Sequence, residues 1–128
     1  MAPGRRAILQ LAVAALAIAD QRTYPPTPAA PFGIRAWLEG DRVLVLDVRE
    51  PVLSQSPAAL LGDPEADADS GLGGIYRQWV YASRGLTLHV SEPTGEIRQL
   101  YAYEPVTVEQ FLDSALARVE VRRIPRAR

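Results

Sequence analysis

The sequence predicts an α+β fold, in which an antiparallel sheet of about five strands carries its helices packed on one face. Five runs with alternating apolar side chains follow one another mainly through short turns, which is typical of antiparallel sheets rather than of alternating βα units. Two further segments carry helix caps, so the expected order of elements is β-β-α-β-β-β-α. A chain of 128 residues has the length of one such domain.

The first two strands are expected at residues 32–38 and 43–48, joined by a turn at the residues EGDR. In the first run, Ile34, Ala36 and Leu38 fall on one side. The second run is apolar on both sides, which predicts that both of its faces are covered. Together the two runs are typical of a β-hairpin.

A short helix is expected at residues 54–61. Ser56 suits the N-cap, because its side-chain oxygen can accept a hydrogen bond from an otherwise unpaired backbone N–H. Pro57 suits the first helical position, where a missing N–H costs nothing. Gly62 suits the residue just past the end, and Pro64 forbids continuation. The helix is therefore bounded by signals at both ends.

An acidic loop is expected at residues 63–74, where Asp63, Glu65, Asp67 and Asp69 recur at every second position. This spacing invites comparison with the calcium-binding loop of EF-hands, in which a glycine directly follows the third acid and a glutamate closes the loop. Here the glycine comes one place late, and a tyrosine stands at the closing position. A solvated acidic loop is the interpretation that this pattern favours, with weak cation binding as the alternative.

Three consecutive strands are expected at residues 75–81, 86–91 and 97–102, a stretch that holds the only histidine. Alternation places Leu86, Leu88 and Val90 on one face, which is expected to be the core. The other face is then expected nearer to solvent, where aromatic and polar side chains form a candidate binding face. Its expected members are Tyr76, Thr87, His89, Arg98 and Tyr103.

The last element is expected to be an amphipathic helix at residues 105–119. Thr107, followed by Gln110 three residues later, fits a capping box. Apolar residues then recur at helical spacing and form one stripe, which makes this helix the expected cover of the core face. The stripe comprises Val108, Phe111, Leu112, Ala115, Leu116 and Val119.

Residues 1–19 have the order of charged, apolar and small-residue segments that is typical of a secretory signal, with cleavage expected after Ala19. A structural N-terminal helix is the alternative. Residues 20–31 contain four prolines and are expected to form an extended linker. The α+β domain is expected at residues 32–121 and an arginine-rich tail at residues 122–128. The apolar run is too short to span a bilayer comfortably, so no stable membrane span is expected after cleavage.

Composition excludes several classes of chemistry. The chain has no cysteine and no lysine, which rules out disulfides, thiolate metal ligands, cysteine nucleophiles and lysine Schiff bases. A formal net charge of −1 gives no overall field that would favour nucleic acid. His89 is the only histidine, and its strand neighbours offer no carboxylate on the same face. The sequence therefore predicts no catalytic, cofactor or metal site.

Leu61, Gly62, Pro64, Trp79 and Tyr81 form a sparse pattern, in which a helix ending in LG-x-P is followed by strands that carry W-x-Y. Over about a third of the chain, this pattern is similar to small envelope domains of the SmpA/OmlA type, which share the architecture of a beta-lactamase inhibitor protein. The resemblance implies a non-enzymatic, protein-binding module of the cell envelope. The chain departs from the family in placing a hairpin before a single helix and in having no cysteine to be lipidated.

Three hypotheses for the function remain open at this point. The first is an exported, non-catalytic domain that binds an unidentified protein in the periplasm or outside the cell. The second is an intracellular interaction or regulatory domain whose N-terminal helix is structural. The third is a small enzyme that uses Asp or Glu with Arg, which a deep pocket holding two carboxylates beside Arg49, Arg77 or Arg98 would favour.

Overall fold

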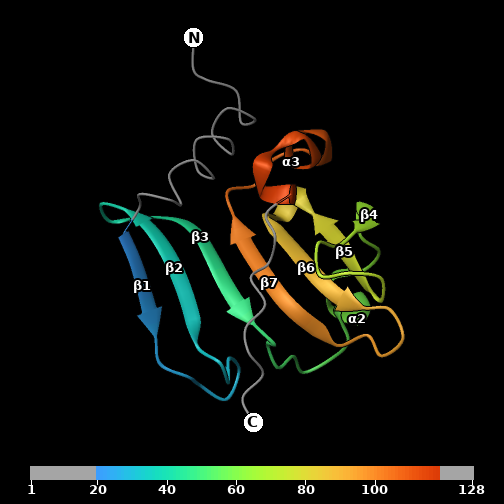
Figure 1. The fold of residues 1–128 in the computed structure, drawn as a ribbon, viewed down its shortest axis with the longest axis horizontal. Helices are drawn as coiled ribbons and strands as arrows, with labels where there is room; N and C mark the ends of the chain where they lie inside the picture. Colours follow the sequence, from blue (N-terminus) through green and yellow to red (C-terminus); the bar gives the residue numbers. More distant parts are fainter. Residues whose placement is uncertain (1–19, 119–128) are drawn as a thin grey trace.

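The structure is a computed structural model that describes residues 20–118. The expected signal segment (1–19) and the end of the chain (119–128), with its arginine-rich tail, lie outside the described residues. Within the described part, seven strands form one sheet in the order β1-β2-β3-β7-β6-β5-β4 (Figure 1). The strands are β1 (Asp20–Tyr24), β2 (Ile34–Glu39), β3 (Arg42–Arg49), β4 (Ala66–Asp69), β5 (Tyr76–Tyr81), β6 (Leu86–Ser91) and β7 (Ile97–Tyr103). The helical elements are α2 (Pro57–Leu61), α3 (Val108–Asp113) and the 3-10 turns η1 (Ala82–Arg84) and η2 (Ala115–Arg118).

Two antiparallel meanders make up the sheet. Strands β1 to β3 form one of them, strands β4 to β7 form the other, and the pairing of β3 with β7 joins the two. The chain leaves β3 through the segment that contains α2, reaches the far edge at β4 and returns strand by strand to β7 (Figure 1). The α+β class is thus confirmed, whereas the expectation of about five strands is wrong.

The two unexpected strands form the edges of the sheet. β1 lies in the segment expected to be a linker, and because all of its residues are exposed, it is held by backbone pairing with β2 and not by burial. β4 lies in the expected acidic loop, where half-buried Ala66 and Ala68 alternate with exposed Asp67 and Asp69. Both edges carry charged side chains, which disfavour edge-to-edge association with other sheets.

Helices lie on both faces of the sheet, so the expectation that they pack on one face is wrong. The side packed by α3 is called the α3 face, and its core consists of Val45, Val80, Ala82, Tyr101, Tyr103, Val106, Phe111 and Leu116. The other side is called the α2 face, and its core consists of Tyr81, Leu88, Val90 and Ile97, with Leu53 and Leu61 packed against them. The central strands carry apolar side chains on both sides, and each side therefore needs its own cover.

The caps of α2 are those that the sequence predicts, although the helix begins at Pro57 rather than at residue 54. Ser56 accepts a hydrogen bond from the backbone N–H of Ala59 at 3.2 Å, and Pro57 occupies the first turn. Gly62 ends the helix with a φ of +74°, a backbone conformation that favours glycine. The hydroxyl of Tyr81 donates to the carbonyl oxygen of Gly62 at 2.9 Å. This bond fastens the end of α2 to the sheet.

Helix α3 has the predicted capping box, but it begins at Val108, three residues later than expected, and ends at Asp113, six residues earlier than residue 119. The capping box of Thr107 and Gln110 is present, with both of its hydrogen bonds at 3.1 Å. The early end has a local cause at Ser114, which is buried. Its hydroxyl donates to the carbonyl oxygen of Phe111 at 2.6 Å, and its backbone N–H donates to the same oxygen. Such a side chain competes with the helical hydrogen bonds, and the chain continues in η2.

Candidate functional site

Cross-strand register brings polar side chains from four strands into one row on the α3 face. Arg49 of β3 is paired with Gln99 of β7, Gln99 with His89 of β6, and His89 with Gln78 of β5. Directly paired residues point to the same face of an antiparallel sheet, so the four side chains form a line. Gln99, His89 and Gln78 are buried, and each therefore needs a hydrogen-bonding partner inside the protein.

A neighbouring row contains Arg35, Asp47 and Tyr101, which are paired in the same way. Asp47 is only 3% exposed, and its Oδ1 accepts a hydrogen bond from Nε2 of Gln99 at 2.6 Å. Burial raises the pKa of Asp47, and it outweighs the opposing effects of the Gln99 hydrogen bond and of the Arg49 and Arg35 charges. Burial, together with the charge of Asp47, also raises the pKa of Tyr101. The site thus holds a carboxyl group that is protonated more readily than one in water.

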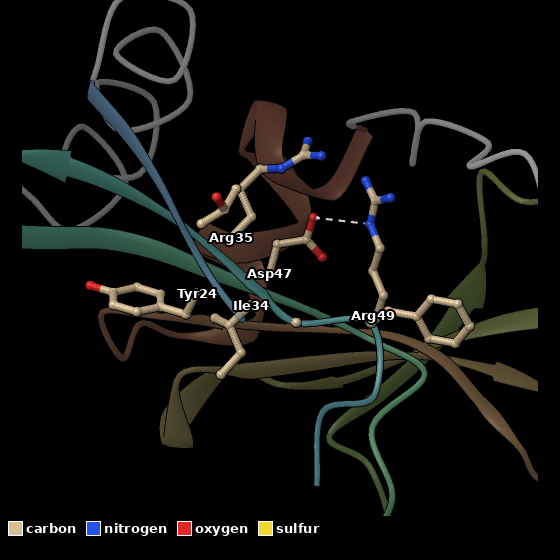
Figure 2. A pocket seen from close by; sticks show the side chains of 8 residues that line it. Tyr24, Ile34, Arg35, Asp47 and Arg49 are labelled. Atoms are coloured by element: carbon tan, nitrogen blue, oxygen red, sulfur yellow. Dashed lines mark ion pairs between the residues drawn. The ribbon is translucent and has the colours of Figure 1, made fainter. Parts of the chain in front are cut away.

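A cavity of about 80 Å³ lies at the end of this row, where the connection from β1 to β2 passes beside β3 (Figure 2). Its lining residues are Thr23, Tyr24, Phe32, Gly33, Ile34, Arg35, Asp47 and Arg49. Figure 2 shows the side chains of Arg35, Asp47 and Arg49 pointing to one side of the sheet and those of Tyr24 and Ile34 to the other. Because a water molecule takes about 30 Å³, the cavity has room for two or three waters or for the head of one small anion.

The two guanidinium groups beside Asp47 retain unused hydrogen-bond donors. The side chain of Arg49 is 15% exposed, and its Nε lies 3.8 Å from Oδ2 of Asp47, an ion pair too long for a hydrogen bond. Arg35 lies over the ring of Trp37, with Cζ 5.7 Å from the ring centroid. Within residues 20–118, neither arginine donates a hydrogen bond, although each guanidinium has five N–H groups. Desolvation lowers the pKa of Arg49, so an anion placed here would stabilise its charged form.

His89 has a partner in the structure that the sequence did not reveal. Its Nδ1 is 2.7 Å from Oγ of Ser70, which also accepts a hydrogen bond from the backbone N–H of Leu72 at 3.1 Å. The serine hydroxyl donates to Nδ1 or accepts from it according to the tautomer of the neutral ring. The pair has the spacing of a nucleophile and its base, but burial lowers the pKa of His89 to about 4, which makes it a weak base at neutral pH. These properties favour a structural hydrogen bond.

The burial of His89 predicts that the domain is sensitive to acid. The imidazole binds a proton near pH 6.5 in the unfolded chain but only near pH 4 in the folded chain, so the unfolded state binds more protons between these values. The contribution to stability is complete above pH 6.5, and roughly 3 kcal/mol is lost as the pH falls through this window. Urea unfolding at pH 7 and pH 4.5 should show most of this loss in the native sequence and a smaller loss in His89→Gln.

Asp47 serves as an internal reference for this experiment. Its raised pKa acts in the opposite sense, because burial of its charged form makes the folded state less stable as the pH rises. The carboxyl group is present in both proteins, so it affects them alike. Equal losses of stability in the native sequence and in His89→Gln would assign the acid sensitivity to groups other than His89.

The five residues expected to form a binding face do not meet at the surface. Thr87, His89 and Tyr103 are buried, and Tyr76 and Arg98 are partly exposed. The hydroxyl groups of Thr87 and Tyr103 lie 2.8 Å apart, and that of Tyr103 also donates to the backbone at 3.0 Å. The expectation that this side of the meander lies nearer to solvent is wrong, because residues of α3 and η2 pack on it. A binding role for Tyr76 and Arg98 stays a prediction.

Glu50, which directly follows β3, has a strained backbone. Its φ of +45° makes it the one non-glycine residue with positive φ in the described part of the chain. This conformation costs roughly 1–2 kcal/mol for a residue with a Cβ atom. Oε1 of Glu50 lies 3.3 Å from Nη1 of Arg98, and the two side chains are 42% and 22% exposed. A pair this exposed contributes about 1 kcal/mol or less, so the ion pair does not account for a glutamate at this position.

Two of the four acidic residues of the expected loop, Asp67 and Asp69, form ion pairs with Arg77. Nε of Arg77 lies 2.7 Å from Oδ1 of Asp67, and its Nη1 lies 2.5 Å from Oδ1 of Asp69. Both carboxylates belong to β4, and Arg77 is the direct partner of Asp69 on β5. Among the residues that the structure describes, no group of three or more His, Cys, Asp or Glu side chains is placed to hold a metal ion.

No helix within residues 20–118 combines the length and the apolar character needed to cross a membrane. Comparisons of the chain with protein-family models, with curated proteins and with solved structures find no match.

Proposed function

We propose that this chain is an exported, non-catalytic domain that binds another protein, and that the cavity between Arg35, Asp47 and Arg49 receives a carboxylate group of that partner. The observation that carries the proposal is the environment of Arg49. Its side chain is largely buried, yet it makes no hydrogen bond within the described residues, and its one ion pair is long. Buried charged groups are normally paired and hydrogen-bonded, so a ligand anion would supply what this guanidinium lacks.

The charges around the cavity favour a carboxylate over a phosphate. Two guanidinium groups face one carboxylate, Asp47, which leaves a single positive charge for the ligand to balance. A phosphate dianion would be repelled by Asp47 and would exceed that charge. A carboxylate carries one negative charge, and its planar shape matches the paired N–H groups of arginine.

The surroundings of the cavity favour a protein as the bearer of this carboxylate. Phe32 lines the cavity and is 52% exposed, which offers apolar contact area next to the charged groups. Aromatic and arginine side chains together are enriched at the centres of protein interfaces. The resemblance to SmpA/OmlA-type domains, which implies a protein-binding module, supports the same assignment.

A non-catalytic role fits the chemistry of the ionisable groups. The cavity is lined by a single carboxylate, whereas acid–base hydrolysis by carboxyl groups uses two with different pKa values. The pKa of His89 near 4 leaves Ser70 without an effective base at neutral pH. Binding is therefore the activity that we propose for this domain.

The proposal predicts that the domain binds N-acetyl-phenylalanine, which has a free carboxylate, and not its amide. A titration followed by NMR amide shifts of the full chain should show saturable changes around Arg35, Asp47 and Arg49. Arg49→Gln should weaken binding by about tenfold or more, since a hydrogen bond to a charged group contributes about 1.5–3 kcal/mol. Arg84→Gln is the matched control, because Arg84 is exposed on η1 and does not line the cavity.

Two further probes decide between sources of the anion. N-acetyl-glutamate with an amidated α-carboxyl group presents a side-chain carboxylate, and tighter binding of this probe would assign the site to an acidic side chain rather than to a chain terminus. Stronger binding of inorganic phosphate than of either carboxylate would contradict the proposal. Equal binding of the carboxylate and the amide would contradict it too, as would an unchanged affinity in Arg49→Gln.

Export is proposed from the sequence of residues 1–19, which lie outside the described residues. Cleavage after Ala19 would leave the whole of β1, because that strand begins at Asp20. The mass of the chain recovered from the envelope or the medium of an expressing cell should correspond to a start at Asp20. Recovery of the chain with Met1 intact, together with unfolding on deletion of residues 2–19, would favour the intracellular alternative with a structural helix.

A further inference from the structure

A second hollow, separate from the arginine cavity, lies beside the end of β3. It is a groove of about 370 Å³ between the segment that leads from β3 into α2 and the turn that joins β6 to β7. Part of its lining is apolar and belongs to the edge of the core on the α2 face. The residues that supply this apolar part are Pro51, Leu53, Pro57 and Ile97. The groove is thus large enough to hold an extended side chain, with apolar contacts along part of a lining that is otherwise polar.

Both charged residues that line the groove are carboxylates. Glu50 borders it from the β3 side, and Glu96 borders it from the β6–β7 turn. Glu96 is exposed, and within residues 20–118 its carboxylate forms no ion pair. Glu50 forms an ion pair with Arg98, which does not line the groove. The two rims therefore present negative charge on either side of a partly apolar floor.

The backbone strain at Glu50 is the second observation. Glycine or asparagine would adopt the same left-handed conformation at lower cost, and the exposed pair with Arg98 does not offset the strain. The backbone N–H of Glu50 donates to the carbonyl oxygen of Arg98 at 2.9 Å, and Pro51 follows, so the conformation is fixed from both sides. Strained backbone of this kind clusters at binding sites and switch regions, and here it holds the Glu50 carboxylate at the rim of the groove.

We propose that this groove binds a basic side chain, arginine or lysine, presented by a partner protein. The aliphatic stem would lie on Leu53 and Ile97, and the charged head would lie between Glu50 and Glu96. Charge complementarity points to this occupant, because the lining combines two carboxylates with an apolar floor and contains no basic residue. The groove and the arginine cavity share no lining residue, although they are neighbours in the chain. Arg49 lines the cavity, and the next residue, Glu50, lines the groove.

The test uses the isotope-labelled full chain and three small probes, N-acetyl-arginine methylamide, the lysine counterpart and the citrulline counterpart. Citrulline has nearly the shape of arginine without its charge. Saturable amide shifts at Leu53, Glu96 and Ile97 are expected with arginine or lysine and not with citrulline, and the stronger of the two basic probes identifies the head group. Equal shifts with citrulline would overturn the proposal.

Two variants and one matched control locate the site. Glu96→Gln should weaken binding of the basic probe by about tenfold, because it removes a charge-assisted partner. Glu92→Gln lies in the same turn but does not line the groove, so its affinity should equal that of the native sequence. If the two substitutions weakened probe binding equally, the weakening would come from the general surface charge, and the assignment of the site would be overturned.

Glu50→Asn separates binding from folding, because asparagine tolerates the left-handed backbone. This variant should weaken the basic probe by a similar factor while its melting temperature stays the same or rises. A lower melting temperature with unchanged affinity would assign Glu50 to the fold and overturn the proposal. The chain's own arginine-rich tail is a competing occupant. If replacing its four arginines by glutamine strengthened probe binding, the groove would belong to that tail and not to a partner.

Discussion

Replacing Gly85 by alanine is expected to destabilise the domain by roughly 3 kcal/mol or more, one of the largest effects of any single substitution in this chain. Gly85 has a φ of +68°, and a Cβ atom there would overlap the carbonyl oxygen of Tyr103. The overlapped atom belongs to the backbone of β7, which is held by the sheet and cannot move aside cheaply. The backbone N–H of Tyr103 also donates to the carbonyl oxygen of Gly85 at 2.9 Å, so the two segments are fixed against each other. Urea unfolding followed by tryptophan fluorescence measures the loss.

Gly40→Ala is the matched control for this prediction. Gly40 has a φ of +60°, close to that of Gly85, but a Cβ atom there would meet nothing within 4 Å. Gly40→Ala should therefore lower the free energy of unfolding only by roughly 1–2 kcal/mol, the backbone cost of a residue in the left-handed region. If the two variants lose the same stability, the close approach of Gly85 to Tyr103 is not what requires glycine.

Phe111→Ala is expected to destabilise the domain by about 3–5 kcal/mol, the usual cost of truncating a fully buried phenylalanine. Phe111 is completely buried, and its ring stacks on that of Tyr103 with centroids 5.1 Å apart and an interplanar angle of 20°. It is the one buried residue of α3, so its loss leaves a cavity and loosens the helix over the α3 face. The free energy of unfolding in urea and the near-ultraviolet circular dichroism of the aromatic residues both report this change.

Two further variants distinguish the destabilisation caused by a cavity from that caused by removing an apolar side chain in general. Phe111→Leu keeps most of the volume and should lose less than half of what alanine loses. Ile75→Ala removes an apolar side chain that is largely exposed, and it should change stability by about 0.5 kcal/mol or less. A loss in Phe111→Ala no larger than that in Ile75→Ala would mean that α3 does not cover the core in solution.

The elements that sequence reasoning predicted correctly are those with strong local signals. The caps of α2 at Ser56 and Gly62 and the capping box of α3 at Thr107 each depend on contacts within one helical turn. The strands that it missed depend on their neighbours. β1 has no buried residue of its own, and β4 consists of alanine and aspartate, which are rare in strands. Their strand conformation is supplied by pairing with β2 and β5, which no local pattern encodes.

The candidate site was only partly predictable for the same reason. Alternation alone places Asp47 and Arg49 on one face of β3. Arg35 lies beside them because of the register of β2 against β3. The hydrogen bond from Gln99 to Asp47 depends on the register of β3 against β7. Sequence reasoning placed the polar face of the meander in solvent, because a polar face that is covered by a helix has the same alternation of residues as one that is exposed.

The junction between β3 and β7 also bears on how the chain reaches its native state. Every other strand pair joins consecutive strands, whereas Val45 and Tyr103 are partners although nearly half the chain separates them. The entropic cost of closing that loop must be met before the contacts across it form. The two meanders consist of local pairings, so we expect them to form before the β3–β7 contacts, and we expect their joining to limit the folding rate. The buried polar layer crosses this seam, whereas every residue that lines the arginine cavity belongs to β1, β2, β3 or the β1–β2 connection, so the last step adds the hydrogen bond from Gln99 to Asp47 and the cover of the buried row.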